Sequence, residues 1–336
     1  PWPPTLRAPG SPSSDRADSP LPPKADMSSS ESTPSAKHGA HPRRPRRGWS
    51  LGLLLVALTL AVAACGSPSA PSAGTPTPTS ATLAEGSSER VISVGNTQRS
   101  YRVYRPQGIT AAAPLVMVFH GYTWNAARTE DTFGWNKVAD AQRFIVLYPE
   151  GLNQGFNAGG CCGISSDTHV DDVSAALAMV DDVAKTIALD TDRLFVTGFS
   201  NGGAMTYRMA CETDRFAAFG PVAGGLVVDC KDGKPASILH LHGLADTDVP
   251  VVGDSRIWRT PVDQVLADWR TRDDCAAPGA PTTSGTSHRV TATCAAGREV
   301  GLITIDGLRH AWPTAADGLD ATSTLWAFFA KHPRGH

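Results

Sequence analysis

The feature that most constrains the fold is a repeated alternation of short apolar runs with stretches of helical periodicity. The segment 101–106 shows a period of two, and continuous apolar runs that lead to a glycine or a turn lie at 114–121, 143–151, 193–200 and 237–243. Apolar residues recur at three and four spacing in 170–189 and 201–212. Buried strands that alternate with helices predict a mostly parallel sheet with helices on both faces. Ligands bind such sheets at the carboxyl ends of the strands.

The first 89 residues differ in composition from the rest. A basic cluster at 43–47 precedes an apolar run from Leu51 to Ala64, which is the layout of a secretory signal and is short for a membrane span. We therefore expect four regions: a non-native or untranslated leader at 1–26, a lipoprotein signal peptide at 27–64, a disordered Ser/Pro/Thr-rich tether at 65–89 and one catalytic domain at 90–336.

The signal ends in Val62-Ala63-Ala64-Cys65, which resembles a bacterial lipobox. This pattern predicts a lipid anchor at Cys65 and an extracytoplasmic location, at the cell surface or in the periplasm. An ordinary signal peptide with a chance cysteine, and hence a secreted protein, is the alternative. The formal net charge of -2 gives no electrostatic reason to expect a nucleic-acid partner.

Six cysteines remain after Cys65, and an even number in an exported chain suggests disulfides. Cys275 and Cys294 flank a polar, turn-rich segment, so we expect them to pair with each other. The other four allow three pairings, which stay open: Cys161, Cys162, Cys211 and Cys230. No cysteine has CxxC spacing and no paired histidines follow, so no metal is expected.

The stretch Gly198-Phe199-Ser200-Asn201-Gly202 matches the GxSxG pattern of a nucleophile elbow. An apolar run precedes it and a helical pattern follows it, as this strained strand-to-helix turn requires. We therefore predict that Ser200 is a nucleophile; the alternative is a serine in an ordinary loop.

A serine hydroxyl needs a base and an orienting carboxylate, in the chain order Ser, Asp or Glu, His. His310 follows a strand-like run, whereas His240 and His242 alternate within an apolar segment where packing is expected. Asp246 comes three residues after a strand-ending glycine and is preferred to Asp248. We predict Asp246 and His310 as the partners of Ser200.

The oxyanion of an acyl-transfer reaction needs two preorganised N–H donors. One should be the backbone of Asn201, next to the nucleophile, and the other that of Tyr122, in the loop after an early strand. Aromatic residues beside this loop, Trp124 and Trp312, are predicted to line the substrate cleft. The chemistry requires no metal or organic cofactor.

These motifs together resemble the secreted esterases of the polyhydroxybutyrate depolymerase and feruloyl esterase type, which are related to family one carbohydrate esterases. The resemblance covers Val91 to the C-terminus and rests on "HGYTWN", "YPEG", "GGCCG", "TGFSNGG", "LHLHGLADTDVP" and "HAWP". It implies the α/β-hydrolase fold, the triad Ser200, Asp246 and His310, and the donors Tyr122 and Asn201. No polymer-binding domain is apparent, which departs from the pattern of many extracellular depolymerases.

The expected function is therefore a lipid-anchored serine esterase that acts on polyhydroxybutyrate-type or feruloyl and other aryl esters. An acetyl-xylan esterase or a peptidase of the same fold is the first alternative. A surface lipoprotein that binds a ligand without turnover is the second. The expected partners are a small or polymer-borne ester and, through Cys65, the membrane.

Overall fold

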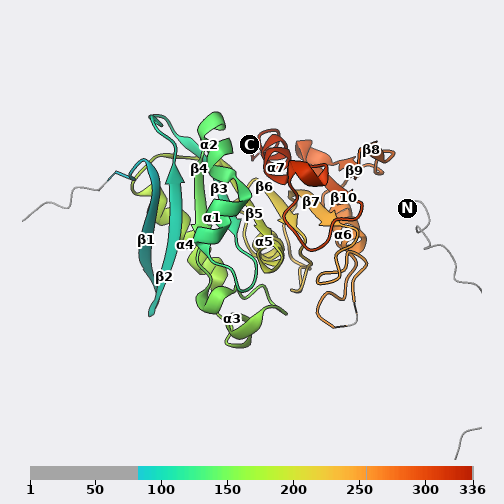
Figure 1. Ribbon diagram of the computed structural model, residues 1–336, viewed down its shortest axis with the longest axis horizontal. Helices are drawn as coiled ribbons and strands as arrows, with labels where there is room; N and C mark the ends of the chain where they lie inside the picture. Colours follow the sequence, from blue (N-terminus) through green and yellow to red (C-terminus); the bar gives the residue numbers. More distant parts are fainter. Residues whose placement is uncertain (1–81, 255, 335–336) are drawn as a thin grey trace, which may run out of the picture. The chain divides into compact units, whose positions relative to one another are not determined.

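The computed structural model describes residues 82–254 and 256–334. Its strands form one ten-stranded mixed sheet (Figure 1). The strand order is β1-β2-β4-β3-β5-β6-β7-β10-β9-β8. The strands are β1 (Gly86–Val94), β2 (Thr97–Arg105), β3 (Ala113–Phe119), β4 (Ile145–Pro149), β5 (Leu189–Phe199), β6 (Ala218–Val222), β7 (Ser237–Gly243), β8 (Thr282–Ser284), β9 (Ser287–Thr293) and β10 (Glu299–Ile305).

The six central strands are parallel to one another; in spatial order they are β4, β3, β5, β6, β7 and β10. An antiparallel hairpin extends each edge, β1–β2 at one and β8–β9 at the other. The chain moves from β3 outward to β4 and then back to β5 on the other side of β3. In parallel sheets, such a reversal marks the place where ligands bind, here the carboxyl ends of β3 and β5.

Helices cover both faces of the sheet (Figure 1). One face carries α4 (Asp172–Ala184), α5 (Asn201–Glu212) and α6 (Val262–Arg272), and the other carries α1 (Ala126–Phe133), α2 (Trp135–Gln142) and α7 (Ala321–Phe329). Short helical turns lie in the loops: η1 (Leu152–Gln154), α3 (Gly163–Asp167), η2 (Ala295–Gly297) and η3 (Ala315–Asp317).

The strand β3 shows why the central strands read as continuous apolar runs. All seven of its residues are buried. Leu115 and Met117 join the hydrophobic core beneath α4, α5 and α6, whereas Val116 and Val118 join the core beneath α1, α2 and α7. Because side chains alternate between the faces of a strand, a sheet covered on both sides needs apolar residues at every position. The predicted mostly parallel sheet with two covered faces is confirmed.

The folded domain begins earlier than the expected boundary at residue 90. Leu83 is buried, the side chain of Arg105 donates a hydrogen bond to its carbonyl, and β1 starts at Gly86. The sequence does not mark this start, because residues 84–89 contain no apolar residue larger than alanine, as suits an edge strand. The leader, the signal peptide and Cys65 lie outside the described residues. Within the described ranges, no helix is both long and apolar enough to cross a membrane.

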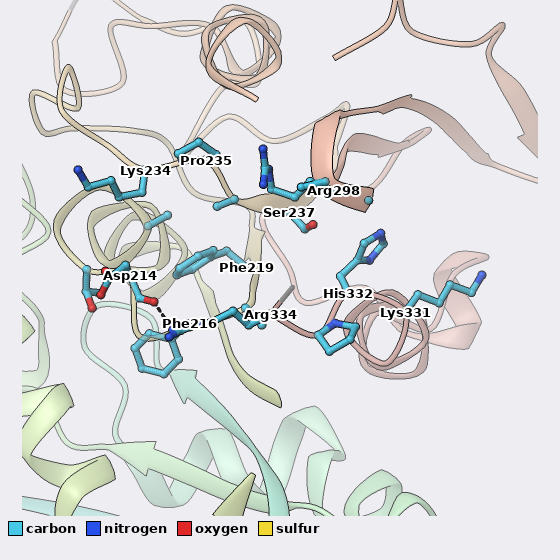
Figure 2. Close-up of a pocket in the computed structure, with 17 residues that line it drawn as sticks. Asp214, Phe216, Phe219, Lys234, Pro235, Ser237, Arg298, Lys331, His332 and Arg334 are labelled. Atoms are coloured by element: carbon cyan, nitrogen blue, oxygen red, sulfur yellow. Dashed lines mark hydrogen bonds between the residues drawn. The ribbon is translucent and has the colours of Figure 1, made fainter. Parts of the chain in front are cut away.

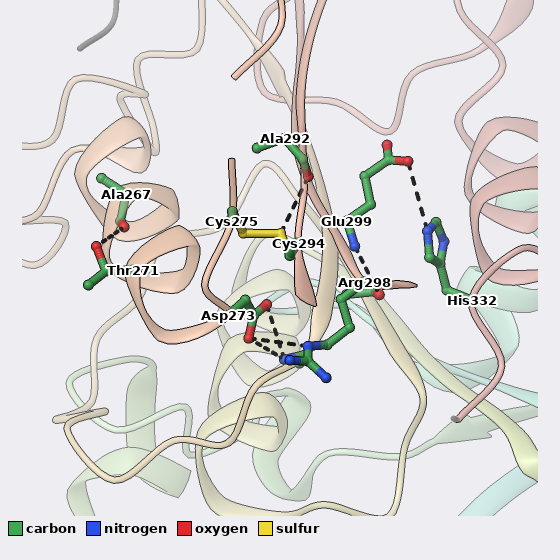
Figure 3. The surroundings of a disulfide bond; sticks show 11 residues. Ala267, Thr271, Asp273, Cys275, Ala292, Cys294, Arg298, Glu299 and His332 are labelled. Atoms are coloured by element: carbon green, nitrogen blue, oxygen red, sulfur yellow. Dashed lines mark hydrogen bonds and ion pairs between the residues drawn. A yellow bond between two sulfur atoms is a disulfide. The ribbon is translucent and has the colours of Figure 1, made fainter. Parts of the chain in front are cut away.

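Three disulfides join the six cysteines of the domain. Cys275 and Cys294 are bonded as expected, and they tie the segment after α6 to the end of β9 (Figure 3). The four cysteines whose pairing was open form the bonds Cys161–Cys162 and Cys211–Cys230. The polar segment between Cys275 and Cys294 contains the β8–β9 hairpin, so part of it has regular structure.

Candidate active site

Ser200 occupies a sharp turn between β5 and α5. Its backbone has φ 57° and ψ −116°, a strained combination for a residue with a side chain. The Ser200 N–H donates to the carbonyl of Val222 at 2.9 Å, and the Ser200 carbonyl accepts the first hydrogen bond of α5 from Ala204. The turn is therefore held by both the neighbouring strand and the helix, and it exposes the hydroxyl at the carboxyl edge of the sheet.

The glycines of the GxSxG pattern are required by close approach of the backbone. A Cβ on Gly198 would lie 2.5 Å from the carbonyl carbon of Gly202, and a Cβ on Gly202 would lie 2.7 Å from the carbonyl oxygen of His120. Real Cβ atoms do not tolerate such contacts. The two glycines thus permit the tight turn and let the end of β3 lie against it.

Asp246, His310 and Ser200 lie in one hydrogen-bonded row. The Ser200 Oγ donates to His310 Nε2 at 2.8 Å, and His310 Nδ1 donates to Asp246 Oδ2 at 2.7 Å. Asp246 follows β7 and His310 follows β10, so the row collects side chains from the carboxyl ends of three parallel strands. Each bond meets the geometry that general-base activation of a serine requires.

The Asp246 carboxylate is fully buried and well supplied with donors. Its Oδ1 accepts from the N–H groups of Asp248 and Val249, both at 2.9 Å. Burial alone would raise the pKa of Asp246, but hydrogen bonds from His242, His310 and Val249 hold it well below its usual range. Asp248, the alternative considered from the sequence, is exposed and contributes only its backbone N–H.

The two predicted oxyanion donors follow adjacent strands, β3 and β5. Neither the Tyr122 N–H nor the Asn201 N–H donates to an acceptor within the described part of the chain. A Cβ on Gly121 would lie 3.1 Å from the ring of Phe199, which shows how closely the two loops approach. Within the described ranges, both N–H groups thus lack a protein acceptor, as donors to an oxyanion would.

His120 fixes the loop that carries Tyr122, a role that the sequence analysis missed. Its Nε2 accepts a hydrogen bond from the Gly151 N–H at 3.0 Å, so its Nδ1 carries the proton and donates to the Gly121 carbonyl at 2.8 Å. Burial lowers the pKa of His120 to about 4, which keeps the ring neutral. The sequence signal for this role was the pair His120-Gly121 directly after a predicted strand.

The two predicted cleft tryptophans differ in their surroundings. Trp124 is half-buried, 5.7 Å from Phe199 between ring centres, with Arg128 3.7 Å above its ring. Trp312 instead is 7% exposed, stacks on Phe133 and donates its indole N–H to Thr322. The expectation that Trp312 lines the cleft is therefore corrected: it is a core residue, because α7 and Phe133 close over it.

Other groups noticed in the sequence lie outside this row. Asp171 caps α4 by accepting from the Ser174 N–H at 3.0 Å. His288 pairs with Asp306 at 2.9 Å on the edge hairpin. In the part of the chain that the structure describes, Asp273, Cys275 and Cys294 form a cluster with metal-ligand atoms. Both sulfurs are in a disulfide and offer no thiolate, so this cluster does not fit a metal (Figure 3).

A cavity of about 600 Å³ lies at the opposite edge of the sheet, beside the amino ends of β6 and β7 (Figure 2). Its charged lining residues are Asp214, Lys234, Arg298, Lys331 and Arg334. The amines of Lys234 and Lys331 point away from each other in Figure 2. None of the residues around Ser200 lines this cavity, so it is separate from the candidate active site.

Comparison with known proteins gives matches to esterases and depolymerases. Residues 99–242 match the family Esterase PHB depolymerase. NocK of Nocardia uniformis subsp. tsuyamanensis, which is named as an esterase, is 30% identical over 255 residues, covering 67% of this chain and 73% of that protein. Feruloyl esterase B of Piromyces equi is 29% identical over 226 residues, covering 61% of this chain and 41% of that protein. The acetyl xylan esterase from Aspergillus awamori has a TM-score of 0.54 at 15% identity, covering 73% of this chain and 99% of that one.

The likeness to the acetyl xylan esterase shows the α/β-hydrolase fold, and the sequence relatives are carboxylic ester hydrolases. This protein is therefore an esterase of the α/β-hydrolase class. It belongs to the Esterase PHB depolymerase family, as the matched residues and the relative from Nocardia show.

Proposed function

We propose that this esterase is a lipid-anchored, extracytoplasmic enzyme that cleaves esters through an acyl-enzyme on Ser200. The observation that carries the mechanism is the continuous hydrogen-bonded row Ser200–His310–Asp246 at the carboxyl edge of the sheet. The strained turn at Ser200 and the two unoccupied N–H groups at Tyr122 and Asn201 support it.

In the first half-reaction, the Ser200 Oγ attacks the ester carbonyl while His310 Nε2 takes the hydroxyl proton. The new oxyanion accepts hydrogen bonds from the backbone N–H groups of Tyr122 and Asn201. When the C–O bond breaks, His310 returns the proton to the departing alkoxide, and Ser200 retains the acyl group. Water then attacks the acyl-enzyme by the same route and releases the acid. Asp246 keeps the Nδ1 proton of His310 in place throughout.

The substrates that we propose are polyhydroxybutyrate-type esters or feruloyl and other aryl esters. Polyhydroxybutyrate-type and feruloyl esters are the classes named for the matched family and for relatives of this chain. Tyr122, which is 44% exposed, and the half-buried Trp124 offer aromatic surface beside the oxyanion loop.

The proposed location depends on the sequence and on the disulfides. An apolar run ends at Ala64 directly before Cys65, and the domain contains three disulfides, which persist in oxidising compartments. Replacing Cys65 by alanine in the full chain should abolish metabolic labelling with fatty acid and release the enzyme from the membrane fraction. A variant that stays membrane-bound would contradict the anchor.

The mechanism is tested by labelling the full-length protein with a fluorophosphonate probe, wild type beside Ser200→Ala. Wild type should label and the variant should not, while both retain the same melting temperature. A folded but unlabelled wild type would contradict the mechanism. A panel of hydroxybutyrate, feruloyl, acetyl and peptide substrates then identifies the acyl group.

A further inference from the structure

A chain of buried polar side chains leads from the nucleophile helix to the loop of Asp246. Tyr207 lies on α5, and His240 and His242 lie on the same face of β7. The Tyr207 hydroxyl is 2.7 Å from His240 Nδ1, and His240 Nε2 is 2.8 Å from His242 Nδ1. His242 Nε2 is 2.7 Å from the carbonyl oxygen of Val249. Both histidines are fully buried, and Tyr207 is 1% exposed.

The directions of the hydrogen bonds in this chain follow from its last member when His242 carries a single ring proton. A carbonyl oxygen only accepts, so His242 Nε2 carries a proton and donates to Val249. Neutral His242 then has an acceptor at Nδ1, which receives the Nε2–H of His240. His240 in turn accepts at Nδ1 from the Tyr207 hydroxyl. Burial, and secondarily the neighbouring His242, lower the pKa of His240 well below its usual range, so the His240 ring is neutral.

The end of the chain lies against the carboxylate of the catalytic row. The Val249 carbonyl accepts from His242, while the Val249 N–H donates to Asp246 Oδ1 at 2.9 Å. His242 Nε2 also lies 3.4 Å from Asp246 Oδ2, the oxygen that faces His310. His242 therefore contacts both the residue that closes the turn around Asp246 and the carboxylate itself.

We propose that His242, held in one tautomer by His240 and Tyr207, is a positioning residue that fixes the Asp246 loop in line with His310. This inference rests on the proposed function, because it assigns His242 an effect on the reactivity of Ser200. A packing role alone would need neither the three aligned donors nor an N–H directed at this loop. Small displacements of catalytic groups reduce rates by up to about 100-fold.

The first test compares His242→Leu and His242→Gln in the full-length protein. Leucine removes the donor, so kcat for a p-nitrophenyl ester and the rate of fluorophosphonate labelling should each fall about 10- to 100-fold, with little change in KM. Glutamine can present an amide N–H near the position of the imidazole Nε2–H, so it should restore much of the rate.

The matched control is His332→Leu. His332 is also buried, is hydrogen-bonded to the Phe328 carbonyl at 2.8 Å, and lines the cavity at the opposite edge of the sheet. Its loss should lower the melting temperature and leave kcat unchanged. A folded His242→Leu that labels as fast as wild type would overturn the positioning role while leaving the esterase function intact.

A second measurement does not depend on whether the leucine variant folds. Imidazole ¹⁵N shifts of the wild-type protein should report the Nε2–H tautomer for both His240 and His242. In Tyr207→Phe the signals of His240 should move, because its Nδ1 loses a donor. An Nδ1–H tautomer at His242 would overturn the proposal. Absence of labelling in a folded wild type would instead overturn the esterase mechanism, and the positioning role with it.

Discussion

The side-chain amide of Asn201 forms hydrogen bonds with both backbone groups of Phe156. Its Oδ1 accepts from the Phe156 N–H at 2.8 Å, and its Nδ2 donates to the Phe156 carbonyl at 3.0 Å. Asn201 is completely buried at the start of α5, and Phe156 belongs to the loop after β4. One residue therefore offers its backbone N–H beside Ser200 and fastens the neighbouring loop with its side chain.

We predict that Asn201→Ala destabilises the protein more than it impairs the nucleophile. The substitution leaves the buried Phe156 N–H without its acceptor, which costs about 1 to 3 kcal/mol, whereas the Phe156 carbonyl still accepts from the N–H groups of Ala158 and Cys162. The backbone N–H of residue 201 remains, so fluorophosphonate should still label Ser200. Denaturant unfolding and labelling rates measure the two effects. Gln98→Ala, which removes an exposed hydrogen bond to Ser93, is the control and should change stability little.

Asp246→Asn should reduce kcat/KM about 10⁴-fold, because an amide favours the wrong tautomer of His310 and no longer stabilises its protonated form. Asp248→Asn is a matched control two residues away, since the exposed Asp248 side chain lies outside the row. Steady-state hydrolysis of an aryl ester checks both. Equal losses in the two variants would contradict the assignment of Asp246.

Stability should fall on acidification as His120 is forced to protonate. The folded protein holds the pKa of His120 at about 4 by burial, against 6.5 for the free side chain. Between these pH values the unfolded chain binds more protons than the folded protein does. The free energy of unfolding therefore decreases as the pH falls from 6.5 towards 4. His120 accounts for about 3 kcal/mol of this loss.

His120→Asn tests this dependence, because asparagine can retain a donor near the Gly121 carbonyl and does not titrate. The difference in unfolding free energy between wild type and variant should shrink as the pH is lowered from 7 to 4.5. Denaturant titrations across this range measure it. A difference that stays constant with pH would show that His120 is not the responsible group.

Removing the Cys211–Cys230 disulfide should lower stability without altering the chemistry. The two cysteines are 19 residues apart, and chain-entropy arguments assign a bond of this span about 3 kcal/mol. The double variant Cys211→Ser/Cys230→Ser should therefore unfold at a lower denaturant concentration. Its labelling rate at 25 °C should match that of wild type. A large loss of labelling in a folded double variant would show that the bond also shapes the site.

Structural elements could be predicted most accurately where one short segment of the sequence contains all the necessary information. The run 237–243 coincides with β7, and 201–212 coincides with α5, because apolar periodicity and flanking glycines define these elements locally. The sharp strand-to-helix turn at Ser200 could be predicted for the same reason, since the elbow motif includes its own strand, turn and helix. The placement of His310 and Asp246 beside Ser200 followed from the order in which strand ends occur along the chain.

Features that depend on distant neighbours were beyond this reasoning. Trp312 follows a strand end, yet α7 and Phe133 bury it, and the sequence before residue 312 does not reveal which helix covers which loop. The pairing of Cys211 with Cys230 requires knowledge of where α5 ends relative to the segment after β6. The partners of His240 and His242 come from another helix and from a loop, so their alternation in the sequence indicated packing and nothing more.

The hydrogen-bonded row of the proposed mechanism joins residues that lie far apart in the sequence. The Ser200–His310 bond joins residues 110 positions apart, and the Asp246–His310 bond joins residues 64 apart. In the proposed mechanism, a polypeptide that ends before β10 has the serine and the carboxylate but no base, so it would not hydrolyse esters until the last parallel strand is added. Ester turnover per milligram of a preparation would then count the molecules in which the whole central sheet is assembled.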